Sequence, residues 1–455
     1  MMTFSDTFIR EAIGGGTDFP QFNAARIHTD TRSIQPGDLF VAIKGDRFDG
    51  HDFVKQALEK GACAALVHSP FKSSFDSSFQ SKLIETSDNL QALRQIASAH
   101  RKRLKAKIFV VGGSNGKTTT KEYLSFLLQA HFSKHGIFKT KKSENSILGV
   151  ALSLLAIRDE EFAVLEVGID EPGWMEKHLE LIRPDAGLLT CIQEEHLERL
   201  KNIETVAREE LQLVHYLKKN SGRFAANVDS SWIREANLPP QSIRYGLKER
   251  ADIEGLFKKP NILSCFGINW LNPLPGEHNA LNLLAALTGL VMMSPTITKE
   301  EIEKISRRLN EFEGEAHRSR WLSFKNDVFV FDDCYNANPS SMESAMTSFQ
   351  QLAEGIRQVL ILGDMLDLGP ESISFHQRIL NIAETSGANE ILTLGSNFAK
   401  AYRHVPSERT KCFLEIDDLK NHIEKNIAPQ TAYLLKGSRG MGLERLLSIW
   451  NNLKA

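Results

Sequence analysis

The strongest chemical signal in the sequence is a glycine-rich segment between an apolar run and a helix-forming run, VVGGSNGKTTTKEYL. Glycines let a backbone wrap around a phosphate, and the free N–H groups at a helix start face it. Lys117 supplies a positive charge, and Thr118 can bind Mg²⁺. The residues predicted to hold nucleotide phosphates are Gly113, Ser114, Asn115, Gly116, Lys117, Thr118 and Thr119.

The spacing of this segment is the shorter pattern G-x-x-G-K-T-T. Val111 stands where the longer phosphate-loop motif has its first glycine. The alternative interpretation is an ordinary glycine-rich turn with a surface lysine. The apolar strand before the segment and the helix after it favour the phosphate loop.

Two further candidates follow apolar runs in the middle of the chain. Glu166 lies near the end of FAVLEVG, and His196 follows AGLLTCI by a few residues. Functional groups in open α/β sheets gather outside the carboxyl ends of the strands. Glu166 could therefore hold a Mg²⁺ that bridges ATP phosphates, and His196 could be a metal ligand. The alternatives are a paired structural glutamate and an ordinary loop histidine.

Three strand-like runs in the last third of the chain also end in charged groups. Asp332 and Asp333 end the first run, Asp364 the second, and Lys436 and Arg439 follow the third. Burying such groups without a ligand would be costly. The pattern predicts the rim of an active site on one face, although each residue singly could belong to a surface loop.

The elements that must position these residues alternate between strand-like and helix-like runs. This alternation predicts an α/β protein with parallel sheets and crossover helices. We expect three domains: a small N-terminal α/β domain, a central parallel-sheet domain with the phosphate loop, and a C-terminal doubly wound, Rossmann-like domain. Their predicted ranges are 1–105, 106–313 and 314–455.

The composition excludes several other classes of protein. The chain has 455 residues, with 55 Lys plus Arg against 57 Asp plus Glu, so no basic field predicts a nucleic-acid partner. Its five cysteines show no C-x-x-C pair, which fits a reducing compartment. The N-terminus lacks the apolar core of a signal peptide, and no apolar run approaches about 18 residues. We expect a cytoplasmic protein without stable membrane insertion.

The order of the motifs resembles the Mur ligase family along nearly the whole chain. HTDTRSIQPGDLFVAIKGDRFDGHDFVKQAL resembles the nucleotide-sugar domain, and GGSNGKTTTKEYL, FAVLEVGIDEPGWM and PGEHNALNLLAAL follow the family order. DDCYNANPSSM with LGDMLDLGPES resembles most closely the branch that adds D-alanyl-D-alanine.

The resemblance implies roles for particular residues. Asp30, Thr31, Arg32 and the segment from Lys44 to His51 would surround a UDP-sugar. Lys117 would neutralise the transferring phosphate of ATP. One Mg²⁺ would be held by Thr118 and Glu166, and His196 would help to hold a second.

Other residues would face the nucleotide or close over the site. Asn282 and Asn336 would face the nucleotide, together with either Arg318 or Arg320. Asp332, Asp333, Lys436 and Arg439 would close over the site.

Two positions depart from the family pattern. Asn145 and Ser146 stand where the family has a pair of asparagines that contact substrate or phosphate. Glu210 occupies the place of a carbamylated lysine, and it could supply the same charge to a metal ion. The alternative for Glu210 is an exposed charge on the predicted helix ETVAREELQLV.

The resemblance implies an ATP-dependent ligase. It would join D-Ala-D-Ala to UDP-MurNAc-tripeptide through an acyl phosphate, as a monomer, in peptidoglycan precursor synthesis. Two alternatives remain open: a related ligase that adds a single amino acid, and a nucleotide-binding regulator without catalysis. The third residue of the tripeptide, diaminopimelate or lysine, also stays open.

Overall fold

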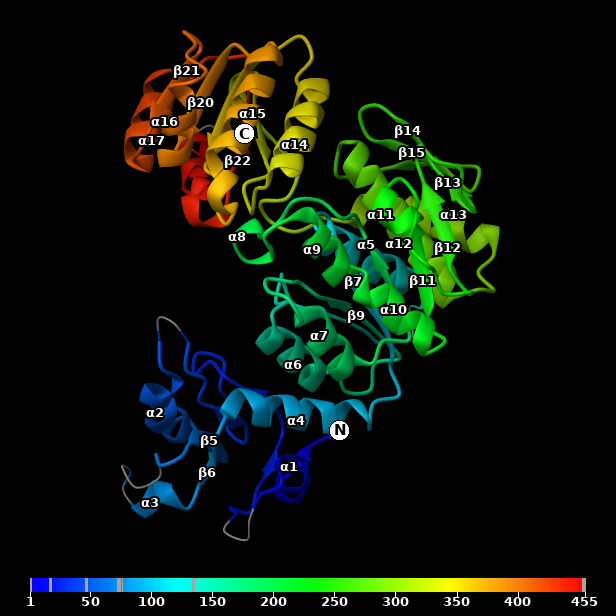
Figure 1. Cartoon of the computed structure of the whole chain (residues 1–455), viewed down its shortest axis with the longest axis vertical. Helices are drawn as coiled ribbons and strands as arrows, with labels where there is room; N and C mark the ends of the chain where they lie inside the picture. Colours follow the sequence, from blue (N-terminus) through cyan, green and yellow to red (C-terminus); the bar gives the residue numbers. More distant parts are fainter. Residues whose placement is uncertain are drawn as a thin grey trace. The chain divides into compact units, whose positions relative to one another are not determined.

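The structure is a computed structural model that describes residues 2–15, 19–45, 48–71, 75, 77–132 and 136–451. The chain forms two compact units (Figure 1). The first unit comprises Met1–Val110, Lys134–Gly168 and Glu176–Ala186. The second comprises Val111–Ser133, Ile169–Met175 and Gly187–Ala455.

The N-terminal part of the first unit is built on a parallel four-stranded sheet in the order β3-β4-β5-β6. Its strands are short and mostly apolar, as expected for a sheet buried on both faces. A separate antiparallel pair, β1 with β2, precedes it. The elements are β1 (Phe4–Ser5), α1 (Asp6–Ile13), β2 (Asn23–Ala24), β3 (Ile27–His28), β4 (Leu39–Val41), α2 (Val54–Glu59), β5 (Ala64–His68), α3 (Ser77–Gln80), β6 (Leu83–Thr86) and α4 (Asn89–Arg101).

The remainder of the first unit contributes two parallel strands, β8 (Ile137–Lys139) and β9 (Phe162–Glu166). Between them lies α6 (Ile147–Ala156), which begins at Ser146 because that hydroxyl accepts a hydrogen bond from the N–H of Gly149. Helix α6 packs against α4. Most of α7 (Trp174–Ile182) also belongs to this unit.

Strand β7 (Lys107–Gly112) carries the chain into the second unit, where α5 (Lys117–His131) follows the glycine-rich loop. The parallel strands β11 to β13 and an antiparallel ladder, β14-β15-β16, lie further along. Helix α12 packs against α5. The elements are β10 (Ala186–Leu189), α8 (Leu197–Leu200), α9 (Ile203–Glu210), α10 (Gln212–Lys219), β11 (Arg223–Asn227), α11 (Ser231–Arg234), β12 (Ile243–Gly246), β13 (Ile253–Glu254), β14 (Leu256–Lys258), β15 (Ile262–Cys265), β16 (Ile268–Leu271), α12 (Glu277–Met293) and α13 (Lys299–Arg308).

The C-terminal part of the second unit is a six-stranded sheet in the order β17-β18-β22-β19-β20-β21. Strand β17 is antiparallel to β18, and the other neighbouring pairs are parallel. The elements are β17 (Arg320–Phe324), β18 (Val328–Asp332), α14 (Pro339–Leu352), β19 (Arg357–Gly363), α15 (Ser372–Thr385), β20 (Glu390–Leu394), α16 (Ser396–Tyr402), β21 (Thr410–Phe413), α17 (Ile416–Lys425), β22 (Thr431–Lys436) and α18 (Leu447–Asn451).

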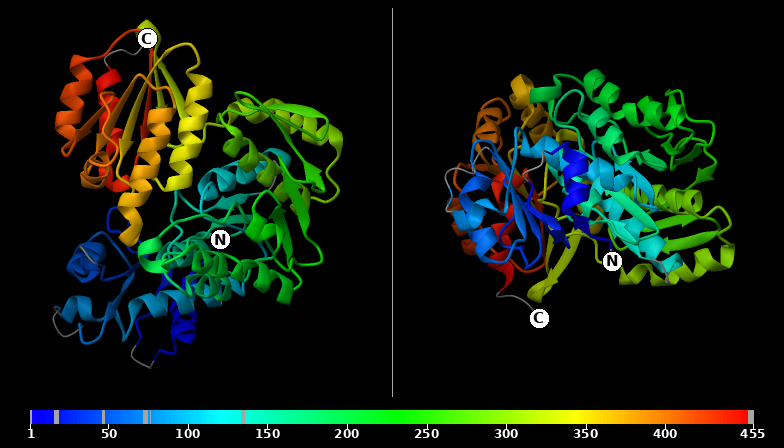
Figure 2. Two further views of the ribbon diagram at one scale, coloured as in Figure 1. Left: turned by 45° about the horizontal axis from the view of Figure 1, so that its top comes forward. Right: turned by 90° about the horizontal axis from the view of Figure 1, so that it is seen from below.

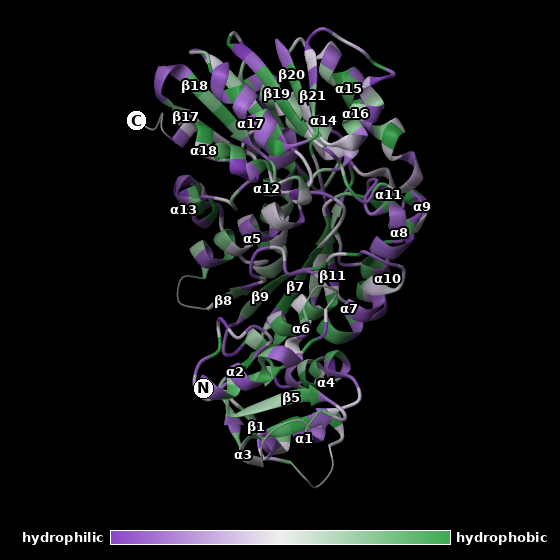
Figure 3. Ribbon diagram, turned by 90° about the vertical axis from the view of Figure 1, so that its left-hand side faces the viewer, coloured by the Kyte–Doolittle hydropathy of each residue, from purple (hydrophilic) through white to green (hydrophobic). Residues whose placement is uncertain are grey.

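Helices cover both faces of this sheet (Figure 2). Alternate residues of a strand point to opposite faces, so Phe331 packs with α14, α15 and α16, while Val330 packs with α17 and α18. Figure 3 shows the strands coloured mainly as hydrophobic, with hydrophilic residues on the helices. The expected doubly wound arrangement is confirmed for these strands and helices.

None of the described helices is long and apolar enough to cross a membrane. The predicted α/β class with parallel sheets is confirmed. The expected strand runs correspond to β4, β5, β7, β9, β10, β18, β19, β20 and β22, whereas β21 was not predicted.

Candidate active site

The glycine-rich loop has the backbone conformation that only glycine adopts easily. Gly113 has φ of 107° and Gly116 has φ of 80°, and α5 begins at the next residue, Lys117. A Cβ on Gly113 would lie 2.4 Å from the Thr190 hydroxyl, and one on Gly116 would lie 2.3 Å from the Asn282 side-chain oxygen. Side chains at these two positions would therefore clash with neighbouring segments, so the loop can pack this closely only with glycine there.

Lys117 is held by groups on both sides of its ammonium. Its Nζ donates to the carbonyl oxygen of Ser114 at 3.2 Å and to Oε2 of Glu195 at 3.2 Å. The Lys117 side chain is 14% exposed and that of Glu195 is 6% exposed, so this ion pair is largely shielded from water. Sequence reasoning missed Glu195. Its only signal was its place beside His196 after an apolar strand.

Glu210 is fully buried at the end of α9, so the alternative of an exposed helix residue is wrong. Its Oε2 accepts a hydrogen bond from the N–H of Gly113 at 3.0 Å. Burial raises the pKa of Glu210 to about 8, with a further contribution from the charge of Glu195, and Lys117 acts in the opposite direction. Glu210 therefore reaches the backbone of the phosphate loop.

One carboxylate oxygen on each of two glutamates is buried without a hydrogen-bond partner among the described residues. These atoms are Oε1 of Glu195 and Oε1 of Glu210. A buried polar oxygen without a partner is costly. The pair, beside Lys117, therefore has the oxygen chemistry that a hard divalent cation requires.

Asn115, in the middle of the loop, is bound by amide and hydroxyl groups from two other segments. Its Nδ2 donates to Gln193 Oε1 at 2.8 Å, to Ser340 Oγ at 3.1 Å and to Asn338 Oδ1 at 3.2 Å. Asn338 returns a hydrogen bond of 3.0 Å to Asn115 Oδ1 and also caps the start of α14. The phosphate loop is thus tied to the first turn of α14.

Asn282, predicted to face the nucleotide, lies behind the loop on α12. Its Oδ1 accepts a hydrogen bond from Thr120 Oγ1 at 3.3 Å and sits against Gly116. Thr118 and Thr119 are buried in the first turn of α5. The structure therefore brings Asn282 to the phosphate loop.

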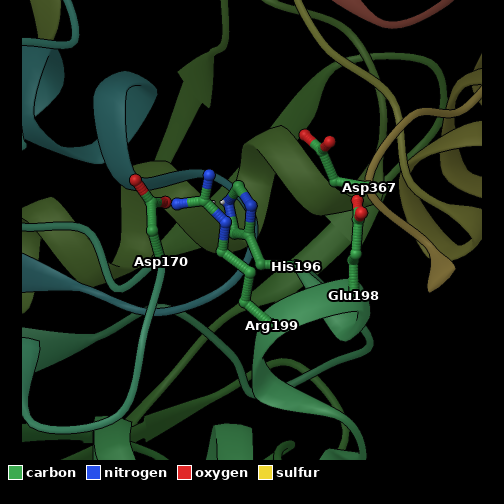
Figure 4. Close-up of a pocket in the computed structure, with 5 residues that line it drawn as sticks. All are labelled: Asp170, His196, Glu198, Arg199 and Asp367. Carbon is green, nitrogen blue, oxygen red and sulfur yellow. Dashed lines mark ion pairs between the residues drawn. The ribbon is translucent and has the colours of Figure 1, made fainter. Parts of the chain in front are cut away.

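His196 borders a pocket together with Asp170, Glu198, Arg199 and Asp367 (Figure 4). In Figure 4, His196 and Arg199 lie between Asp170 on one side and the two carboxylates of Glu198 and Asp367 on the other. His196 Nε2 is 3.5 Å from Asp170 Oδ1. A left-handed backbone, with φ of 49°, places His196 immediately before α8.

The C-terminal strand ends bring together some of the predicted rim residues. Lys436 Nζ lies 2.7 Å from Asp333 Oδ2 and donates to the backbone carbonyl of Asn336 at 2.9 Å. Asp333 Oδ1 accepts from the N–H of Ser319 at 2.9 Å. Asp332 instead contacts His317, so the two neighbouring aspartates face different partners.

Two arginines meet at Tyr335. The guanidinium carbon of Arg318 lies 4.0 Å from the ring centroid, and that of Arg439 lies 5.6 Å from it. Arg320 is exposed at the start of β17, and the Asn336 side chain is also exposed. Of the two asparagines in the YNANP segment, Asn338 is the one that contacts the phosphate loop.

Asp364 belongs to the sheet rather than to an open rim. Its carboxylate is buried and accepts hydrogen bonds from the N–H groups of Asn397 and Phe398 at 2.9 Å each, in the first turn of α16. His376 Nε2 is 3.6 Å away. The expectation that Asp364 borders the active site is wrong, because helix capping satisfies its charge.

In the first unit, Glu166 and Asn145 form a pair. Asn145 Nδ2 donates to Glu166 Oε1 at 2.8 Å, and the N–H of Glu166 donates to Thr140 Oγ1 at 3.1 Å. Glu166 is buried at the end of β9, as its place in the sequence predicted. A predicted metal ligand and a predicted substrate residue are therefore in contact.

The predicted sugar-binding residues lie in the N-terminal part of the first unit. Asp30 and Arg32 form an exposed ion pair of 2.6 Å, and the Thr31 hydroxyl donates to Gln56 Oε1 at 2.9 Å. Lys44 is exposed and pairs with Asp49 in an isolated antiparallel bridge. The residues at 46 and 47 of the predicted segment lie outside the described part of the chain.

Comparison with known families defines the class of protein. Residues 24–101 match the Mur ligase family, catalytic domain; residues 111–290 match the Mur ligase middle domain; and residues 317–439 match the Mur ligase, glutamate ligase domain. The chain belongs to the Mur ligase family.

Individual relatives show which members of the family this chain is similar to. The chain is 31% identical to UDP-N-acetylmuramoyl-tripeptide–D-alanyl-D-alanine ligase of Bacillus subtilis, with 96% of each chain covered. It is 30% identical to the Escherichia coli enzyme of the same name, with 92% of each covered. The crystal structure of MurF from Acinetobacter baumannii is 25% identical, matches with a TM-score of 0.85 and covers 98% of each chain.

Proposed function

We propose that this chain is an ATP-dependent ligase that joins D-alanyl-D-alanine to UDP-MurNAc-tripeptide in the cytoplasm. The single observation that carries the chemical part is the environment of Lys117. Its ammonium lies at the start of α5, between a loop carbonyl and the buried carboxylate of Glu195. The relatives align over more than nine-tenths of the chain, and their names support the choice of substrates.

A carboxylate and an amine do not condense unaided in water, so ATP must convert the carboxyl group into an electrophile. The terminal carboxylate of the tripeptide attacks the γ-phosphate, which forms an acyl phosphate and releases ADP. The amine of D-Ala-D-Ala then attacks the acyl carbon, and phosphate leaves. Positioning and charge neutralisation dominate phosphoryl transfer, and Lys117 with the loop N–H groups supplies both.

We propose ATP and Mg²⁺ as the cofactors. The loop conformation supports phosphate binding, since Gly113 and Gly116 have positive φ and α5 begins directly after them. The buried oxygens of Glu195 and Glu210 support a cation near Lys117, and Thr118 and His196 are further candidate ligands. When bound, Mg²⁺ neutralises phosphate charge. Glu166 remains a proposed ligand on the evidence of its strand-end position.

The C-terminal residues are proposed to bind the incoming dipeptide. The Lys436–Asp333 pair is mostly buried, whereas the Arg439 side chain is 54% exposed. An exposed guanidinium can form paired hydrogen bonds to the free carboxylate of D-Ala-D-Ala. Arg318, stacked on the same tyrosine, is proposed as the arginine nearer to ATP.

We further propose three domains with ranges 1–105, 106–313 and 314–455, which the ranges of the three matched family models support. We also propose that the chain is a monomer. We propose further that a UDP-sugar binds to Asp30, Thr31, Arg32 and Lys44.

An ADP-release assay tests the proposed function. ATP, Mg²⁺ and UDP-MurNAc-tripeptide, with either diaminopimelate or lysine as third residue, are supplied with D-Ala-D-Ala, with D-Ala alone or with no amine. We expect release of ADP at a sustained rate only with D-Ala-D-Ala. Turnover with a single amino acid would favour the related ligase, and ATP binding without turnover would favour a regulator.

A further inference from the structure

The described residues contain one group of three different metal-ligating side chains outside the phosphate loop. It consists of His317, Asp332 and Cys334, and one ligand atom of each lies within 4.8 Å of the others. Asp332 and Cys334 are buried, and His317 is partly buried. Nothing in the proposed ligation uses this group, which we call the HDC cluster.

The fold brings the cluster together across an antiparallel ladder. Arg320 pairs with Asp332 in the register of β17 and β18, and the N–H of Tyr335 donates to the carbonyl oxygen of His317 at 3.1 Å. His317 therefore lies opposite the residues that follow β18. Because both sides of the cluster are anchored by backbone hydrogen bonds, its geometry does not depend on the side chains alone.

At present Asp332 holds the other two members by hydrogen bonds. His317 Nδ1 is 2.9 Å from Asp332 Oδ2, and the Cys334 thiol donates to Asp332 Oδ1 at 3.1 Å. Burial and the charge of Asp332 raise the pKa of Cys334 far above its usual range. Without a cation the thiol thus keeps its proton, and both carboxylate oxygens of Asp332 face donors that a metal ion could replace.

We propose that the HDC cluster is a binding site for a borderline divalent cation of the Zn²⁺ type. Imidazole, thiolate and carboxylate are the ligands that Zn²⁺ takes in proteins, whereas Mg²⁺ prefers oxygen ligands alone. Binding releases the thiol proton of Cys334 to solvent, and the His317 proton moves by exchange with solvent from Nδ1 to Nε2, which frees Nδ1 for the ion. One thiolate and one carboxylate then balance the charge of the ion, which suits a buried site.

Glu444 offers a further oxygen near the cluster. Its charge contributes to the raised pKa of Cys334, and its Oε2 is buried without a hydrogen-bond partner among the described residues. Its other oxygen lies 3.5 Å from Arg439. Three protein ligands leave one position of a tetrahedral ion open, and either Glu444 or a water molecule can fill it.

The test uses the full-length, metal-free protein with Co²⁺ as a spectroscopic substitute for Zn²⁺, in excess Mg²⁺ to occupy oxygen sites. We expect one Co²⁺ per chain, a thiolate-to-cobalt charge-transfer band, and loss of that band when Zn²⁺ is added. Cys334→Ser should abolish the band, and Cys412→Ser, a cysteine on β21, should retain it. A band of equal strength in Cys334→Ser, or no band in the wild type, overturns the proposal.

A second measurement keeps the proposal testable if Cys334→Ser folds poorly. Thermal unfolding is followed with and without Zn²⁺ in the wild type, in His317→Gln and in His404→Gln, an exposed histidine of the same part of the chain. Zn²⁺ should raise the midpoint in the wild type and in His404→Gln but not in His317→Gln. An equal rise in His317→Gln would show that the ion binds elsewhere and would overturn the proposal.

Discussion

The ammonium of Lys117 and the carboxylate of Glu195 form a largely buried ion pair of 3.2 Å, and the same ammonium donates to the Ser114 carbonyl of the glycine-rich loop. This ion pair holds the Lys117 ammonium in place before a phosphate binds. It also implies that the lysine has two roles, one with Glu195 in the free protein and one with the phosphate during the reaction.

Lys117→Ala should leave a folded protein without measurable ligation. The lysine side chain supplies charge rather than core packing, so we expect a loss of at least about a thousandfold in turnover. Circular dichroism tests whether the variant folds, and the ADP-release assay tests whether it still ligates. Lys102→Ala, at an exposed lysine after α4, is the matched control and should retain full activity. Turnover like that of the wild type in Lys117→Ala would remove the phosphate-loop assignment.

Glu195→Gln should lower kcat/KM for ATP by roughly tenfold to a hundredfold, which corresponds to about 1.4–2.8 kcal/mol. The neutral amide keeps the shape of the side chain but no longer orients Lys117 by charge. Glu194→Gln, at the preceding and more exposed glutamate, serves as the control. Steady-state kinetics over a range of ATP concentrations measures both. Equal values for the two variants would show that the Lys117–Glu195 pair has no part in catalysis.

Glu210→Gln should change both the stability and the metal dependence of the protein. Because the pKa of Glu210 is raised to about 8 in the folded state, its contribution to stability is fully present below the ordinary glutamate pKa and is lost as the pH rises through about 8. In metal-free buffer, Glu210→Gln should therefore be more stable than the wild type near pH 8 by roughly 2–4 kcal/mol. This difference should disappear near pH 4.

The same variant should need more Mg²⁺ for half-maximal ligation, because one carboxylate near the cation is lost. Activity of the wild type should be indifferent to added bicarbonate, whereas Glu210→Lys should be partly rescued by it. Denaturant titrations at several pH values and Mg²⁺ titrations of activity measure these effects. Unchanged metal dependence in Glu210→Gln would leave Glu210 as a buried loop-anchoring residue only.

Arg439→Ala should impair ligation far more than binding of the UDP-linked substrate. Its guanidinium is proposed to hold the dipeptide carboxylate, so KM for D-Ala-D-Ala should rise by about tenfold or more. The dissociation constant of the UDP-linked substrate, measured by calorimetry on the full chain, should stay the same. Arg445→Ala, at an exposed arginine paired with Asp417, is the control. A parallel loss in both measurements would show that Arg439 stabilises the fold instead.

Local sequence patterns predicted the elements well because hydrophobic periodicity and glycine position act over a few residues. The phosphate loop and the strand-end position of Glu166 were predictable for that reason. Contacts between segments that are distant in the sequence were not predictable. Asn115 and Asn338 are 223 positions apart, and no local pattern shows that Asn338, rather than Asn336, meets the loop.

The sequence also did not show which groups the polar residues after the strands contact. Asp333 and Asp364 both follow apolar runs, yet Asp333 pairs with Lys436 while Asp364 is buried against the start of α16. Only the tertiary structure distinguishes a carboxylate that faces a lysine from one that caps a helix. Glu195 was missed because its ion pair with Lys117 spans 78 positions of the chain.

If the chain joins D-Ala-D-Ala to the tripeptide through an acyl phosphate, one carboxylate oxygen of the tripeptide leaves with the inorganic phosphate. The most direct measurement is mass spectrometry of the products formed from tripeptide carrying ¹⁸O in its terminal carboxylate, with ATP, Mg²⁺ and D-Ala-D-Ala. We expect UDP-MurNAc-pentapeptide and inorganic phosphate that contains one ¹⁸O atom from the substrate. Absence of the pentapeptide, or phosphate without ¹⁸O, would contradict it.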